Sequence, residues 1–153
     1  MSALFSVSYA ARFALNRAGV IDFAVMPLEG LWWASGMPAF SIGDESAWDW
    51  TMLIMQPDEV TADVLADAKI RAAAKVPVTA HERLRLERFA GGLAAQVLHV
   101  GPYSAEGPTI ARLHAFIAEQ GRELAGQHHE IYLSDPRRSA PEKLKTIIRQ
   151  PMR

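Results

Sequence analysis

Hydrophobic positions along the chain follow two different periods, and each period predicts one kind of element. Apolar residues recur at three- and four-residue spacing over residues 2–17, which predicts a helix. Over residues 20–33 apolar and polar positions alternate, which predicts a strand with a bulge or an edge position at Pro27. A second strand is predicted over residues 48–56, after a connecting loop at residues 37–46.

The second half of the chain predicts two further helices and four strands. Gly91-Gly92 lies between two apolar runs, which is a strong hairpin signal. The predicted elements are a helix at 61–75 capped by Thr61, hairpin strands at 84–89 and 93–100, a helix from Ser104 with Ile110, Leu113 and Ile117 facing inward, and strands at 128–134 and 145–150.

The order of these elements indicates an internal repeat. Helix, strand, strand in the first half corresponds to strand, helix, strand, strand in the second, and Ile54, Gln56 and Pro57 match Ile148, Gln150 and Pro151. We therefore expect one domain over residues 1–153, with half-repeats at about 1–57 and 84–153 joined by the 61–75 helix. Strands that bury one face against helices predict an α+β fold with an antiparallel sheet.

Composition excludes several classes of function. The 16 Lys and Arg residues nearly balance the 17 Asp and Glu residues, and a net charge of −1 gives no electrostatic basis for binding nucleic acid or an anionic membrane. The chain has no cysteine, and His128 and His129 point apart on one strand, so we expect no metal site. Gly91-Gly92 is a turn rather than a phosphate-binding loop, so we expect no cofactor. Without a signal peptide or an apolar run of about 18 residues, the expected location is the cytoplasm.

The tryptophans are the unusual feature of the sequence, because all four lie between positions 32 and 50. On the second predicted strand Trp48, Trp50 and Met52 share a face by the period of two. Two alternatives stay open: the indoles are core, or they line a broad apolar pocket. Adjacent Trp32 and Trp33 cannot both point to the same side, so at least one of them faces away from a single core.

The second candidate feature is a carboxylate on a later predicted strand. Alternation places Glu130 and Tyr132 on one face with His128, and Ile131 on the other. Either the Glu130 face is solvated, or it lines a groove in which a carboxylate lies beside a phenol. In a groove, desolvation would raise the pKa of the carboxylate and let it accept a cation or act as a general base.

Four segments together resemble the GyrI-like superfamily of small-molecule-binding proteins, and in particular its stand-alone branch with a Leu-Glu-Gly-Leu-Trp-Trp signature. The segments are residues 26–33 (MPLEGLWW), 48–57 (WDWTMLIMQP), 99–103 (HVGPY) with Glu106, and 130–136 (EIYLSDP). The resemblance implies duplicated βαββ units related by a pseudo-twofold axis, with a central ligand groove. Compared with that pattern, the first strand of the first unit is expected to be absent here. Either the start is truncated, or the sheet edge is left open or is filled by another chain, as in a homodimer.

The resemblance also implies two functions. Such domains bind planar, lipophilic and often cationic compounds, for example as effector-binding domains of multidrug-responsive regulators. The stand-alone branch includes hydrolases that detoxify DNA-alkylating natural products by opening their cyclopropane ring. Carried over by motif, Glu130 is the groove carboxylate, and the walls are Trp33, Trp50 and Tyr103, with Trp32, Trp48, Glu106 and Tyr132 as further ligand-binding candidates. In the hydrolase alternative Glu130 and Tyr103 are catalytic: Glu130 deprotonates the attacking water, and Tyr103 donates to the developing phenolate.

Overall fold

The computed structural model describes residues 1–34, 48–75 and 77–153, which divide into two compact units. One unit comprises Met1–Pro27 and Leu53–Phe89, and the other comprises Leu28–Met52 and Ala90–Arg153. The loop predicted at 37–46 therefore lies outside the described residues. No helix in the described ranges is long and apolar enough to cross a membrane. The half-repeats expected from the sequence stay a prediction.

The first unit is helical and is built from α1 (Ser2–Arg17), α2 (Ala62–Ala72) and α3 (Val78–Arg83). The period over residues 2–17 predicted α1 correctly, because its apolar side chains pack in one cluster with α2. Thr61 caps α2 as predicted: its hydroxyl oxygen accepts a hydrogen bond from the backbone N–H of Val64 at 3.4 Å. The α-helix ends at Ala72, and residues 73–75 form a 3-10 turn.

The strand predicted over residues 20–33 is wrong in its first part. The first strand, β1, covers Leu28–Ala34 only. Ile21 and Phe23 instead pack, half-buried, against the helical cluster. The alternating pattern at residues 21–25 therefore belongs to a connecting segment, which packs every second side chain against the helices. The strand begins directly after Pro27, which has no N–H to donate to a ladder.

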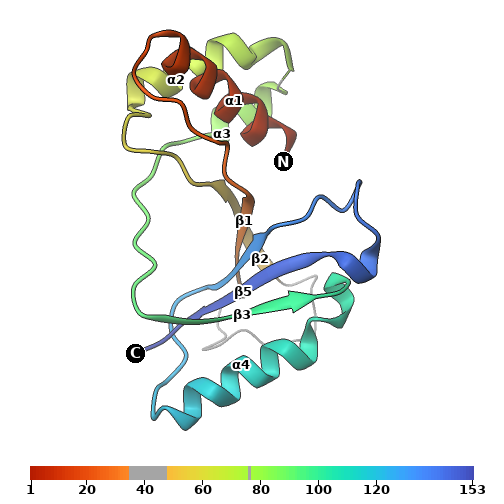
Figure 1. Ribbon diagram of the computed structural model, residues 1–153. Helices are drawn as coiled ribbons and strands as arrows, with labels where there is room; N and C mark the ends of the chain where they lie inside the picture. Colours follow the sequence, from red (N-terminus) through yellow and green to blue (C-terminus); the bar gives the residue numbers. More distant parts are fainter. Residues whose placement is uncertain (35–47, 76) are drawn as a thin grey trace. The chain divides into compact units, whose positions relative to one another are not determined.

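The second unit contains an antiparallel five-stranded sheet in the order β2-β1-β4-β5-β3 (Figure 1). Its other strands are β2 (Trp48–Ile54), β3 (Ala94–Val100), β4 (His128–Tyr132) and β5 (Lys145–Pro151). Helix α4 (Gly107–Glu119) lies along β3 and β5 (Figure 1). It buries Ile110, Leu113 and Ile117 against the sheet, as the sequence predicted. The predicted α+β class with an antiparallel sheet is confirmed.

Two further predictions in this half are corrected. Residues 84–89 form no strand, so there is no hairpin: β3 pairs with β5 instead, with Ala94 opposite Pro151 and Val100 opposite Lys145. Leu86 and Phe89 are exposed, so the 84–89 run has no buried face that would fix it in a sheet. The helix predicted from Ser104 begins at Gly107, because residues 103–105 form a 3-10 turn ahead of it.

Candidate functional site

The centre of the candidate site is Glu130, on the central strand β4. It lies opposite Gly30 of β1 and Ile148 of β5, and the residue is 8% exposed. Helix α4 covers Ile148, so the Glu130 face of the sheet is the face that α4 occupies at the β3–β5 end. The solvated alternative for Glu130 is therefore wrong. Residues 128–131 are all buried, so both faces of β4 are covered.

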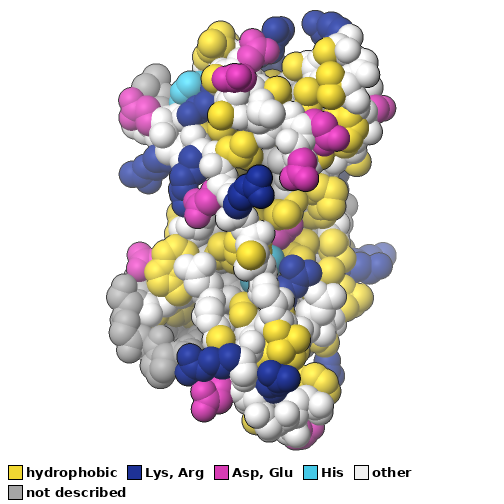
Figure 2. Space-filling model, turned by 90° about the vertical axis from the view of Figure 1, so that its left-hand side faces the viewer, with side chains coloured by type: hydrophobic (Ala, Val, Ile, Leu, Met, Phe, Trp, Pro, Cys, Tyr) yellow, Lys and Arg dark blue, Asp and Glu magenta, His cyan; other side chains and the backbone are white. Residues whose placement is uncertain are grey.

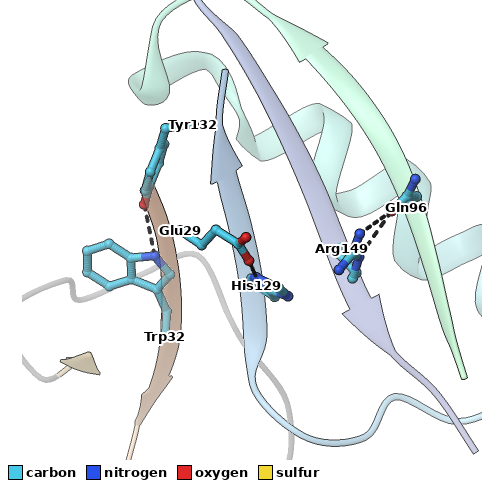
Figure 3. A network of polar contacts seen from close by, with 6 residues as sticks. All are labelled: Glu29, Trp32, Gln96, His129, Tyr132 and Arg149. Atoms are coloured by element: carbon cyan, nitrogen blue, oxygen red, sulfur yellow. Dashed lines mark hydrogen bonds and ion pairs between the residues drawn. The ribbon is translucent and has the colours of Figure 1, made fainter. Parts of the chain in front are cut away.

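Both carboxylate oxygens of Glu130 accept hydrogen bonds from its own strand. The Tyr132 hydroxyl donates to Oε2 at 2.8 Å, and Nε2 of His128 lies 3.0 Å from Oε1. Trp32 Nε1 donates to the Tyr132 oxygen at 3.1 Å, which links β1 to this network (Figure 3). Burial and the neighbouring Glu130 charge raise the pKa of Tyr132, so its hydroxyl keeps the proton that it donates.

Gly30 makes this arrangement sterically possible. A Cβ atom on Gly30 would lie 2.7 Å from Trp32 Nε1 and 2.9 Å from the Tyr132 hydroxyl, both too short for a real contact. The indole and the phenol therefore meet directly above the backbone of Gly30, across the ladder from Glu130. The sequence motif contained this glycine, but only the register shows that its missing side chain is the space for two aromatic groups.

A second buried carboxyl, Glu106, lies beside Glu130. Glu106 is the last residue before α4 and is 5% exposed. Its pKa is raised to about 8, first by burial and then by the negative charge of Glu130, while the nearby Thr146 hydroxyl opposes the shift. At neutral pH the Glu106 carboxyl is thus protonated, beside the Glu130 carboxylate.

His99 fixes the segment that carries Glu106 and Tyr103. This buried imidazole lies next to the last residue of β3, with Nε2 3.3 Å from the Pro102 carbonyl oxygen and Nδ1 3.1 Å from the Thr109 hydroxyl. With its proton on Nε2, the ring donates to the carbonyl and accepts from the hydroxyl, so it ties the end of β3 to the first turn of α4. Between those two points the chain has little freedom to move Tyr103 and Glu106.

Tyr103 forms the edge of the site. Its ring meets Tyr132 edge-on, with centroids 5.7 Å apart, and the residue is 40% exposed. Burial raises the pKa of the Tyr103 phenol, and the negative charges of Glu106 and Glu130 raise it further. A half-exposed, protonated phenol next to two buried carboxyls can donate a hydrogen bond to a bound molecule.

The four indoles do not all lie together. Trp32 and Trp48 contact edge-to-face at 6.2 Å, and the Met52 terminal carbon is within 3.3 Å of the Gly30 Cβ position, so the face predicted for Trp48 and Met52 is the Glu130 face. Alternation places Trp50, which is 60% exposed, on that face as well. It places Trp33 on the opposite face from Trp32, away from Glu130.

The opposite face of the sheet carries a second buried pair that the sequence analysis missed. Glu29 Oε2 lies 2.7 Å from His129 Nε2, and both side chains are less than a tenth exposed (Figure 3). Alternation places His129 on the face opposite to Glu130, but only the β1–β4 register brings Glu29 to it. The His128–Glu130 pair and the His129–Glu29 pair therefore lie on opposite faces of the sheet, and both involve β4.

Other features of the described residues lie elsewhere. Acidic and basic side chains are interspersed on the face shown in Figure 2, in line with the small net charge. Within the described ranges, no group of three or more His, Asp and Glu side chains is placed to hold a metal ion. Two cavities of about 410 and 460 Å³ lie along α1 and α2 in the helical unit, and neither is lined by a residue of the Glu130 site.

Comparisons with known proteins identify the family of this chain. The family model described as a GyrI-like small molecule binding domain matches residues 20–153. An uncharacterized conserved protein from Listeria innocua is 42% identical, with a TM-score of 0.87 over 99% of this chain and 77% of that one. Two crystal structures described as hydrolases from the same organism are 39% and 40% identical, with TM-scores of 0.82 and 0.83, over 99% of this chain and 76% and 77% of theirs. No curated protein matches the chain.

Proposed function

Because this chain belongs to the GyrI-like small-molecule-binding family, we propose that its Glu130 site binds planar, lipophilic compounds that carry a positive charge. The observation that supports this choice of ligand is the buried Glu130 carboxylate beside aromatic rings. A buried anion without a full counter-charge is costly, and a cationic ligand supplies that charge.

The aromatic groups account for the lipophilic and planar part of the proposal. Trp48 and Trp50 share the Glu130 face, and Tyr103 is half-exposed at its edge. Stacking and cation–π contact with such rings contribute roughly 0.5–2 kcal/mol each. A flat aromatic cation can use the rings and the carboxylate together, whereas a small hydrophilic cation can use only the carboxylate.

Glu130→Gln is expected to weaken the binding of rhodamine 6G about tenfold, because it removes the negative charge and keeps the side-chain shape. Fluorescence anisotropy of the dye measures the affinity. Glu29→Gln is the matched control, since it changes a buried carboxyl that also contacts a histidine but on the opposite face. Equal affinity of wild type and Glu130→Gln for the dye would exclude the proposed role of this carboxylate.

We propose hydrolysis of cyclopropane-bearing alkylating compounds as a second function. The two similar structures described as hydrolases favour hydrolysis, and the sequence resemblance suggests the substrate class. In this proposal Glu130 takes a proton from water, and the oxygen of that water bonds to the cyclopropane CH₂ carbon. The C–C bond breaks, and its electron pair turns the conjugated carbonyl of the substrate into a phenolate. Tyr103 donates a hydrogen bond to the phenolate oxygen. The proton that Glu130 took from water then passes through solvent to this phenolate oxygen.

Mass spectrometry distinguishes the two functions. The protein is incubated with a cyclopropane-bearing alkylator, and the hydrolase proposal expects a product that is heavier by one water molecule, formed faster than in buffer. Glu130→Gln is expected to lower the rate of this product about 100- to 10,000-fold, the usual contribution of a general base. Recovery of intact compound at the buffer rate would leave binding as the function and rule out hydrolysis of that class.

A further inference from the structure

His128 is a buried histidine whose ring contacts the Glu130 carboxylate. The two residues are two positions apart on β4, so their side chains lie on the same face. The His128 side chain is 0% exposed, while that of Glu130 is 11% exposed. A ligand at this face can therefore touch Glu130 but not His128.

The contact between them fixes the orientation of the carboxylate. The last torsion of a glutamate is broad, so one hydrogen bond leaves the carboxylate free to rotate. Here Oε1 lies 3.0 Å from His128 Nε2, and Oε2 accepts the Tyr132 hydroxyl at 2.8 Å. Because Nε2 faces a carboxylate oxygen, it carries the ring proton and donates it. Two donors on two different oxygens define the plane of the group.

We propose that His128 is a positioning residue that holds the Glu130 carboxylate in the plane in which it meets a bound cation. This inference rests on the proposed function, since it concerns the same carboxylate. It assigns the ligand contact to Glu130 and the orientation of that contact to the buried imidazole. The lone pairs that His128 and Tyr132 leave unused are the ones available to Glu106 and to the ligand.

Two amide substitutions of His128 that differ in length test whether a donor at this position must reach Glu130 Oε1. Gln at position 128 can place an amide N–H near the position of Nε2, whereas Asn carries the same group on a shorter side chain that does not reach Oε1. We expect His128→Gln to bind rhodamine 6G within about twofold of wild type and His128→Asn to bind it about tenfold more weakly. Circular dichroism and thermal unfolding establish that each variant is folded at the assay temperature.

The neighbouring histidine provides the matched control. His129 is equally buried and contacts a glutamate at a similar distance, but on the opposite face of the sheet. His129→Asn is therefore expected to lower stability without changing the affinity of the folded protein for the dye. If His129→Asn weakened binding as much as His128→Asn, loss of packing would explain both and the positioning role would be wrong.

A double substitution separates this inference from the proposed function. If His128 acts through the Glu130 charge, His128→Asn has little further effect in a Glu130→Gln background. A tenfold further loss in that background would overturn the positioning role and leave the proposed function intact. If Glu130→Gln alone left dye binding unchanged, the proposed function would fail, and the inference that rests on it would fail with it.

Discussion

Gly30→Ala is expected to reduce affinity for rhodamine 6G about 10- to 100-fold, because overpacking by one carbon costs about 1–3 kcal/mol at a rigid site. The added Cβ would lie 2.7 Å from Trp32 Nε1 and 2.9 Å from the Tyr132 hydroxyl. Both groups would have to move, and their mutual hydrogen bond and the bond from Tyr132 to Glu130 would be lost or distorted. Fluorescence anisotropy gives the affinity, and the loss of Trp32 contact is read from tryptophan emission.

Gly121→Ala is the control for a general loss of stability. Gly121 follows α4 with φ +67°, and a Cβ there meets nothing within 4 Å. Alanine at this position is strained in its backbone and destabilises the protein without reaching the sheet. Unchanged dye affinity in Gly30→Ala would show that the aromatic pair above this glycine takes no part in ligand binding.

Glu106→Gln is expected to make the protein more stable at pH 8 than wild type by about 1–3 kcal/mol, after allowance for solvent screening of the carboxyl. The pKa of Glu106 is raised from 4.5 to about 8 in the folded state. Below pH 4.5 the carboxyl is protonated in both folded and unfolded chains. Between pH 4.5 and about 8 the unfolded chain loses the proton and the folded chain keeps it, so the stability of wild type falls as pH rises.

Urea unfolding of both proteins from pH 4.5 to 8.5 measures this effect. The difference between variant and wild type should grow with pH through that window, because glutamine has no proton to lose and stays neutral at every pH. Glu119→Gln, at an exposed position near the end of the same helix, is the control. A difference that stays constant over this pH range would contradict the raised pKa of Glu106.

Much of the candidate site could be predicted from its residues. Strand alternation placed Glu130, Tyr132 and His128 on one face, and the motif pointed to Glu106 and Tyr103 on a different segment. The contacts of Trp32 with Tyr132 and Trp48 place this indole within the Glu130 network. Trp33, expected in the wall, is placed by alternation on the other face, and whether it contacts a ligand remains a prediction.

Other parts of the site depend on contacts between distant segments. His99 has no sequence feature that marks it as a clamp, because its partners Pro102 and Thr109 are reached only when the turn after β3 closes. The buried pair of Glu29 and His129 joins residues 100 positions apart, and their contact follows from the β1–β4 register. No local pattern encodes such a register.

The sequence by itself determined most of the helices and strands and which strand residues share a face, because helix and strand periods depend only on neighbouring residues. It assigned α1, the Thr61 cap, the inward face of α4 and the shared face of Glu130 with Tyr132 correctly. Only the tertiary structure decided that this face is buried, that β3 pairs with β5 rather than with residues 84–89, and that Gly30 lies opposite Glu130. Those three facts depend on the order and register of the strands in the sheet. Strand order and register are set by contacts between residues that are far apart in the chain, so no local pattern predicts them.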